Sequence, residues 1–295
     1  MQKIRKKPTL KYIVKEMRPK QWTKNILVYA ALLFGGGLFA DTKIIFVTMA
    51  FLSFCLVSSS VYFFNDLIDV DNDRKNPHKC HRPIAAGKIS IFFAYVSAFI
   101  LAIMGTLLAY AINIFCFELV LAYLIVNVIY TLRLKHVVII DVMIIATGFV
   151  MRAIMGAIAV EMQMTVWFLL CVLFLSLFLA LGKRRHELEE VNENTVKTGR
   201  KVLRFYSLEF IDQLMTIVTT ALLICYVLFT TDANTKNHEG MMYTIPLVVY
   251  GVFYYLYVVR VKHGGGAPDE ALYKEKPILI VVLIYLVSIV IIRNI

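Results

Sequence analysis

The chain has 295 residues, of which 60% are hydrophobic and 17% are charged, and its mean hydropathy is +0.73. A soluble globular domain carries about a quarter charged residues, so this composition excludes an ordinary soluble protein. The formal net charge is +11. No nucleic-acid-binding module is visible in the sequence, so we expect a lipid bilayer, and no nucleic acid, to be the partner of this charge.

Apolar windows of membrane-spanning length recur along the chain, and a bilayer core of roughly 30 Å needs about 17 to 25 helical residues. The windows predict an all-α polytopic membrane protein with nine transmembrane helices. The predicted spans are residues 25–40, 44–64, 90–111, 115–131, 137–160, 165–182, 211–230, 243–260 and 277–292. We expect residues 1–24 to form a basic cytoplasmic N-terminal segment and residues 25–295 a single membrane domain.

The predicted loops differ sharply in their content of Lys and Arg. The N-terminal segment carries nine, and the second, fourth, sixth and eighth loops carry five, two, seven and four, where Arg260 at the end of the eighth span is counted with the eighth loop. Only Lys43, Lys236 and Arg293 fall on the opposite side of the membrane in this arrangement. Because cytoplasmic loops are enriched in Lys and Arg, we expect a cytoplasmic N-terminus and an external C-terminus.

The second span ends in the acidic stretch NDLIDVDNDRKN, residues 65–76. If the helix continues, Asp66, Asp69 and Asp73 fall within about 60° of one another, while Asp71 points to roughly the opposite side. Carboxylates on one helix face repel each other unless a cation lies between them, although acid at a solvated helix end is an alternative. Mg²⁺ typically takes one or two carboxylates plus substrate phosphates. The predicted metal-binding set is Asn65, Asp66, Asp69 and Asp73.

The same stretch resembles the Asn-Asp-x-x-Asp-x-x-x-Asp signature of the UbiA superfamily of intramembrane prenyltransferases, and HRPIAAG follows it as in that family. Three further segments narrow the resemblance: RPKQWTKN (18–25), LGKRRHE (181–187) and RVKHGGGAPDEALYKEKP (260–277). Together with YTLRLKHVVIIDVMIIATGFVMRAIMGAIA (130–159), they resemble the branch that makes decaprenyl-phosphoryl phosphoribose.

This resemblance implies a Mg²⁺-dependent transfer of 5-phosphoribosyl from phosphoribosyl diphosphate to a polyprenyl phosphate. The reaction would take place at the cytoplasmic face of the cell (inner) membrane. Typical family members carry a second acidic motif in the sixth loop, whereas this loop opens with Lys183 and Arg184. Basic side chains there suit a donor that carries a 5-phosphate besides its diphosphate.

The resemblance implies two sets of site residues. The expected catalytic residues are Asp66, Asp69, Asp73 and Lys183. The expected substrate-binding residues are Lys20, Lys24, Asn25, Tyr62, Arg82, Tyr130, Lys135, Asp141, Arg184 and Glu187.

Two other functions remain open on the sequence. The first is transfer of an isoprenyl group from a prenyl diphosphate to an aromatic acceptor; the missing Asp-x-x-x-Asp pattern in the sixth loop argues against it, although Glu187 and Glu190 could still hold a second metal. The second is a cation transporter that uses the acidic stretch. It would need charged groups at the membrane midplane, and the predicted spans offer little besides Arg152.

Overall fold

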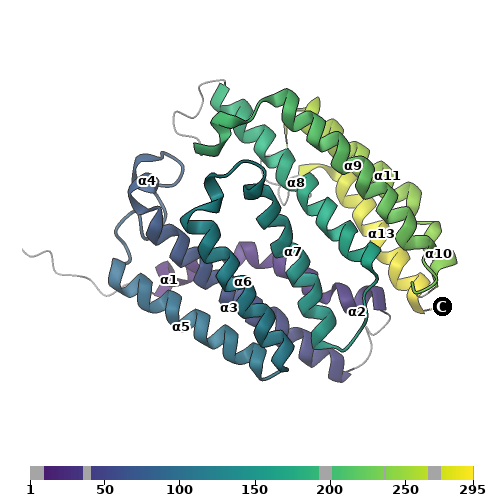
Figure 1. Cartoon of the computed structure of the whole chain (residues 1–295), viewed down its shortest axis with the longest axis horizontal. Coiled ribbons are helices and arrows are strands. Elements are labelled where there is room, and N and C mark those ends of the chain that lie inside the picture. The colour runs from purple at the N-terminus through teal and green to yellow at the C-terminus, as the bar shows by residue number, and fades with distance from the viewer. Residues whose placement is uncertain (1–9, 36–40, 193–200, 236, 265–273, 295) are drawn as a thin grey trace, which may run out of the picture. The chain divides into compact units, whose positions relative to one another are not determined.

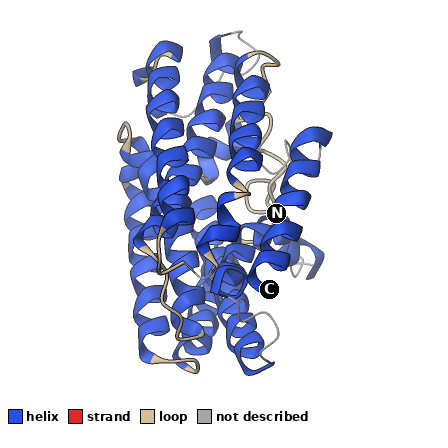
Figure 2. Ribbon diagram, turned by 90° about the vertical axis from the view of Figure 1, so that its right-hand side faces the viewer, coloured by secondary structure: helices blue, strands red, loops and turns tan. Residues whose placement is uncertain are grey.

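The computed structural model describes residues 10–35, 41–192, 201–235, 237–264 and 274–294 (Figure 1). Within these ranges all regular secondary structure is helical (Figure 2). The α-helices are α1 (Leu10–Met17), α2 (Ala30–Gly35), α3 (Asp41–Ile68), α4 (Val70–Lys75), α5 (Ile91–Tyr110), α6 (Ile114–Leu132), α7 (Ile140–Ala159), α8 (Val166–Asn192), α9 (Leu208–Thr231), α10 (His238–Met242), α11 (Ile245–Arg260) and α13 (Lys276–Asn294). The 3-10 helices are η1 (Pro19–Tyr29), η2 (Leu134–His136) and η3 (Lys201–Phe205).

Eight helical segments in the described part of the chain are long and apolar enough to cross a membrane, which makes this a multi-pass membrane protein. They are Thr42–Ile68, Ile91–Tyr110, Ile114–Leu132, Ile140–Ala159, Val166–Val191, Leu208–Thr231, His238–Arg260 and Lys276–Arg293. They correspond to eight of the nine predicted spans. Several of them begin at a polar N-cap, where the side chains of Ser90, Asn113 and Ser207 accept hydrogen bonds from backbone N–H groups three residues later.

The first predicted span, residues 25–40, differs from the other eight. Its residues 25–29 belong to η1, its residues 30–35 form the short helix α2, and residues 36–40 lie outside the described residues. The sequence here contains three successive glycines, Gly35 to Gly37, and glycine disfavours a continuous helix by about 1 kcal/mol per residue. The count of nine spans therefore rests on the sequence pattern for this segment.

The chain divides into two compact units. Unit 1 comprises Met1–Tyr29, Ala40–Leu134 and Ile154–Glu161, and unit 2 comprises Ala30–Phe39, Lys135–Ala153 and Met162–Ile295. Each unit is described separately below.

Unit 1 is built on the packing of α3 against α5, which Figure 1 shows in neighbouring positions. A Cβ atom on Gly105 would lie 3.0 Å from the carbonyl oxygen of Ser53 and 2.5 Å from a Val57 methyl group, so only glycine allows the helices to approach this closely. Ser53 donates a hydrogen bond to the Gly105 carbonyl (2.7 Å), and Ser60 donates one to Ala98 (2.7 Å). Small and hydroxylated residues are the usual contacts between membrane helices.

The segment η1 lies along α3 in the same unit. The Trp22 indole N–H donates to the Ser59 hydroxyl at 3.1 Å, and the Asn25 amide donates to the Ser58 hydroxyl at 3.3 Å. The η1 backbone also approaches the end of α7 that belongs to unit 1. A Cβ atom on Gly156 would lie 1.9 Å from the Val28 carbonyl oxygen, so this contact requires glycine at position 156.

The helix α1 packs on the C-terminal end of α3 through one apolar face. The side chains of Tyr12, Ile13 and Met17 cover a core cluster that contains Phe63 and Ile84. Residue Ile84 comes from the segment after α4, so α1, the end of α3 and this segment share one core. This packing brings the end of α1 next to the acidic stretch.

Unit 2 is organised by the pairing of α8 and α9. Its core contains Phe178 and Leu181 from α8, Ile211 and Met215 from α9, and Tyr255 from α11. These apolar contacts hold the C-terminal half of α8, where the basic sequence KRRHE is located.

Candidate functional site

Two buried carboxylates of unit 1 share one arginine. Asp66 lies in the last turn of α3 and Asp73 lies in α4, and the two residues are 2% and 3% exposed. The Arg82 Nη1 atom donates to Asp66 Oδ1 at 2.9 Å and to Asp73 Oδ2 at 2.7 Å. Asp66 and Asp73 therefore face the same side of the chain, as the helical projection predicts.

A second arginine, Arg18, contacts the other oxygen of Asp66. Its guanidinium also lies over the Tyr62 ring, 4.9 Å from the ring centroid. Arg18 adopts a left-handed backbone conformation (φ 55°) directly before Pro19. A residue that precedes proline avoids the α-helical region, so α1 ends here and the chain turns into η1. The turn positions the guanidinium on Asp66.

The remaining acids of the stretch are less buried. Asp69 is half-buried at the junction between α3 and α4, and the Asn65 amide lies 3.5 Å from Asp66 Oδ1. Asp71 is 83% exposed and forms an ion pair with Arg74 at 3.3 Å. The outward position of Asp71 agrees with the helical projection, although the helix is interrupted at Asp69.

Glu16, in the last turn of α1, was missed by the sequence analysis. Its side chain is 1% exposed, and neither carboxyl oxygen has a hydrogen-bond partner in the described structure. Burial, followed by the neighbouring Asp66 carboxyl, raises the pKa of Glu16 to about 8, while Arg18 acts in the opposite direction. Burial is also the main cause that raises the pKa of Asp73, and Arg82 opposes it. We call Glu16, Asp66, Asp73, Arg18 and Arg82 the Asp66 cluster.

The donor atoms of the Asp66 cluster fit a hard divalent cation. Among the described residues, no three His, Cys, Asp or Glu side chains already surround a common metal position. Mg²⁺ needs fewer protein ligands than that, since one or two carboxylates plus substrate phosphates and water complete its shell. The buried Asp66 and Asp73 carboxylates are oxygen donors of the kind that Mg²⁺ takes.

Unit 2 contains a second buried ion pair, formed by Asp141 at the start of α7 and Arg184 in α8. They are 0% and 1% exposed, and Arg184 Nε donates to Asp141 Oδ2 at 2.8 Å. Arg184 Nη1 also donates to Glu187 at 2.7 Å. Three predicted substrate-binding residues are thus brought together, and Arg184 is engaged by two carboxylates. Lys183 is the half-buried neighbour of Arg184 in sequence.

Tyr206 completes this ion pair and was also missed by the sequence analysis. Its hydroxyl donates to Asp141 Oδ1 at 2.9 Å and accepts a hydrogen bond from the Ile139 backbone N–H at 2.7 Å. Burial is the largest cause that raises the pKa of Tyr206 to about 12. The phenol therefore remains a hydrogen-bond donor to Asp141 at neutral pH.

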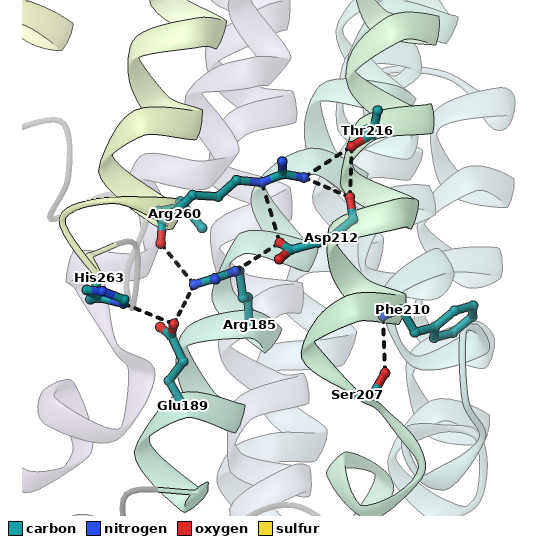
Figure 3. A network of polar contacts seen from close by, with 9 residues as sticks. Arg185, Glu189, Ser207, Phe210, Asp212, Thr216, Arg260 and His263 are labelled. Atoms are coloured by element: carbon teal, nitrogen blue, oxygen red, sulfur yellow. Dashed lines mark hydrogen bonds and ion pairs between the residues drawn. The ribbon is translucent and has the colours of Figure 1, made fainter.

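Arg185 forms a separate network in unit 2 (Figure 3). It contacts Glu189 and Asp212, with 3.0 Å between Arg185 Nε and Asp212 Oδ1. Arg260 reaches the same Asp212 carboxylate at 3.4 Å, and His263 lies 3.1 Å from Glu189. This network links α8, α9 and the end of α11, and its two arginines are matched by two carboxylates. We assign it a structural role.

The remaining predicted substrate-binding residues are Lys20, Lys24, Asn25, Tyr130 and Lys135. Asn25 is buried (1% exposed), and its amide donates to Ser58 and Cys55 of α3. Lys20 is exposed, and Lys24 is half-buried. Tyr130, in unit 1, and Lys135, in unit 2, are half-buried near the end of α6.

Comparison with known proteins identifies relatives along nearly the whole chain. The decaprenyl-phosphate phosphoribosyltransferase of Mycolicibacterium smegmatis is 33% identical over 287 residues, which cover 93% of this chain and 90% of that protein. The decaprenyl-phosphate phosphoribosyltransferase of Corynebacterium glutamicum is 34% identical, with 94% of this chain and 85% of that protein covered. The resemblance to this branch, predicted from motifs, is confirmed.

Solved structures show the same fold. A UbiA homologue from Archaeoglobus fulgidus bound to GPP and Mg²⁺ superimposes with a TM-score of 0.71 at 17% identity, covering 96% of this chain and all of that chain. A structure of digeranylgeranylglyceryl phosphate synthase superimposes with a TM-score of 0.66 at 18% identity, covering 96% of this chain and 98% of that chain. The model of the UbiA prenyltransferase family matches residues 25–274. The chain therefore belongs to the UbiA prenyltransferase family.

Proposed function

We propose that the protein transfers 5-phosphoribosyl from phosphoribosyl diphosphate to a polyprenyl phosphate in a Mg²⁺-dependent reaction that releases diphosphate. The observation that carries this proposal is the 33% identity to a decaprenyl-phosphate phosphoribosyltransferase over 93% of the chain. The buried carboxylates and arginines of the Asp66 cluster support it, because they supply ligands for a metal and for phosphates.

The proposed reaction exchanges one carbon–oxygen bond for another. The bond between the ribose anomeric carbon and the diphosphate oxygen breaks, and a phosphate oxygen of the lipid acceptor forms the new bond to that carbon. Positive charge develops at the anomeric carbon, as in other glycosyl transfers. A phosphate monoester has its second pKa near 6, so the acceptor is already ionised at neutral pH and the protein needs no strong base.

The residues of unit 1 bind the diphosphate in this proposal. Asp66, Asp73 and Asp69 would hold Mg²⁺, which neutralises the diphosphate and makes it a better leaving group. Arg82 and Arg18 are only 25% and 26% exposed, and each of them is held by an aspartate. A guanidinium fixed in this way is suited to a phosphate oxygen because it is always charged and presents several donors in a plane.

The basic residues of α8 are assigned to the phosphate that distinguishes this donor from a prenyl diphosphate. We propose that Lys183 binds the 5-phosphate. Arg184 orients this part of α8 through its contacts with Asp141 and Glu187. A point charge at Lys183 would favour a donor with an additional phosphate.

The membrane arrangement follows from the basic residues. We propose nine spans with residues 25–40 as the first, a cytoplasmic N-terminus and an external C-terminus. The Asp66 cluster and the KRRHE end of α8 then lie on the cytoplasmic side, and the reaction takes place at the inner face of the cell membrane. Phosphoribosyl diphosphate is a charged, water-soluble molecule, so a cytoplasmic site gives it direct access.

A second candidate function is transfer of an isoprenyl group to an aromatic acceptor. The observation that favours it is the fold of the Archaeoglobus fulgidus homologues, whose structures are bound to GPP or DMAPP together with Mg²⁺. A direct test uses purified protein in lipid with radiolabelled phosphoribosyl diphosphate and a radiolabelled isoprenyl diphosphate side by side. Turnover of phosphoribosyl diphosphate alone supports the proposal, and turnover of the isoprenyl diphosphate alone replaces it with the second function.

A further inference from the structure

Glu16 is a buried acid in an unfavourable position. It lies in the last turn of α1, where the helix dipole disfavours a negative charge. It is 1% exposed, no hydrogen bond of ordinary geometry reaches its two oxygens in the described structure, and the Asp66 carboxyl and the Ile84 backbone lie near it. A buried carboxylate without compensation costs several kcal/mol. An ionised Glu16 therefore needs a cation beside it, whereas a protonated Glu16 does not.

The packing of α1 fixes this position. Tyr12, Ile13 and Met17 are partly buried against the core around Phe63, and Glu16 shares their helix face because these positions follow helical spacing. The opposite side of α1 is exposed and includes Leu10 (73%) and Val14 (44%). Glu16 therefore points to the interior of unit 1, and an apolar residue points outward.

When all three of its carboxyl groups are ionised, the charges of the Asp66 cluster do not balance. Three carboxyl groups, on Glu16, Asp66 and Asp73, face two guanidinium groups. Arg18 donates to Asp66, and Arg82 donates to Asp66 and Asp73. Lys79 also acts electrostatically on Asp73. Glu16 is thus the one carboxyl of this cluster to which neither guanidinium donates a hydrogen bond.

We infer that Glu16, together with Asp66, supplies oxygen ligands to the divalent cation. This inference rests on the proposed function, which places the cation at the Asp66 cluster. It adds a ligand from a helix that precedes the aspartate motif by 50 residues in sequence. A cation at this position satisfies the buried Glu16 oxygens, and Mg²⁺ favours hard oxygen ligands of this kind.

The test measures metal binding directly rather than activity. The full chain, purified and reconstituted in lipid nanodiscs, is titrated with Mn²⁺ in the presence of phosphoribosyl diphosphate, and free Mn²⁺ is read from its electron paramagnetic resonance signal. Glu16→Gln keeps the shape of the side chain and removes its charge. We expect it to weaken Mn²⁺ binding by at least about tenfold. Asp71→Asn is the matched control, because Asp71 is 83% exposed, and it should stay within about twofold of the wild type.

The variant Glu16→Asp distinguishes a role of Glu16 as a metal ligand from a role in packing. A ligand role predicts that Asp binds Mn²⁺ more tightly than Gln, because Asp keeps the carboxylate. A packing role predicts that Gln equals the wild type and that Asp is no better. If Glu16→Gln does not give folded protein, Glu16→Asp and Glu16→Ala are compared instead. Wild-type Mn²⁺ affinity in Glu16→Asp together with lost affinity in Glu16→Ala supports the inference. Equal Mn²⁺ affinity in these two variants overturns it.

The outcomes also separate this inference from the proposed function. Wild-type Mn²⁺ affinity in Glu16→Gln, with loss of binding in Asp66→Asn, overturns the role of Glu16 and leaves the proposed function standing. If the wild type binds no Mn²⁺ even with the donor present, the metal-dependent function fails and the inference fails with it.

Discussion

Arg184 donates through Nε to Asp141 Oδ2 at 2.8 Å, and neither side chain is more than 1% exposed. Removal of one partner of a buried ion pair strongly destabilises the folded protein, because the charge of the other partner is left uncompensated. Asp141 here also accepts the hydroxyl hydrogen bond from Tyr206. The pair therefore holds the start of α7, α8 and the segment before α9 together.

We expect Asp141→Ala to lower the free energy of unfolding by about 3–5 kcal/mol, because the Arg184 guanidinium then remains buried beside only Glu187 among its described acidic partners. Unfolding of the purified protein in mixed micelles, followed by circular dichroism, measures this loss. Asp71→Ala is the control and should change the free energy by less than about 0.5 kcal/mol. A similar small change for Asp141→Ala would show that the pair does not stabilise unit 2.

We expect substitution of a buried aspartate to reduce activity more than substitution of an exposed one. Asp66→Asn and Asp69→Asn should each abolish phosphoribosyl transfer without a large change in folding, because each removes a proposed cation ligand. Asp71→Asn should retain most of the activity, because Asp71 is exposed and pairs only with Arg74 among the described ion pairs. Equal losses at Asp66 and Asp71 would contradict the placement of the metal on the buried side.

Lys183→Ala should raise the apparent KM for phosphoribosyl diphosphate more than it affects the acceptor. Loss of one charge-assisted hydrogen bond is worth about 1.5 to 3 kcal/mol, or roughly ten- to a hundredfold. Initial-rate kinetics with each substrate varied in turn measures the effect. Lys183→Arg restores the charge and should recover part of the affinity. An equal rise in the KM for the polyprenyl phosphate would contradict the assignment of Lys183 to the 5-phosphate of the donor.

Gly156→Ala tests the close approach between α7 and η1. The added Cβ would lie 1.9 Å from the Val28 carbonyl oxygen, and backbone must move to accommodate it. We expect a loss of about 1–3 kcal/mol in the free energy of unfolding. The control is Gly251→Ala, where the nearest atom would lie 3.5 Å away. Equal stability of the two variants would mean that η1 does not pack as described.

Reporter fusions test the topology. A reporter after residue 80 or residue 190 should be cytoplasmic, and one after residue 237 should be external, because the basic loops determine the orientation. Protease access in intact and permeabilised cells gives the readout. If residues 25–40 do not cross the membrane, a reporter before residue 25 and one after residue 80 will lie on opposite sides.

The eight long helices were predictable because their apolar windows are nearly uninterrupted. The grouping of Asp66 with Asp73 was predictable as well, because backbone hydrogen bonds from Asp69 to Asn65 and from Asp73 to Asp69 keep the helical phase across the break. The roles of these residues in catalysis remain predictions.

Two contacts of the candidate site were not predictable. Glu16 lies in a segment with nine Lys and Arg, where a lone acid has the appearance of a surface charge. Only its spacing from Tyr12 and Ile13, which puts it on an apolar helix face, could have indicated burial. Tyr206 lies 65 residues from Asp141 and belongs to no motif, so only tertiary packing brings the two together.

The 3-10 helix η1 changes the distance that a given number of residues covers in the N-terminal part of this chain. A 3-10 helix rises about 2.0 Å per residue and an α-helix about 1.5 Å, so the 11 residues Pro19–Tyr29 extend over about 22 Å instead of about 17 Å. Only residues 25–29 of η1 belong to the predicted first span, so this part of the span would reach further per residue than an α-helix of the same length.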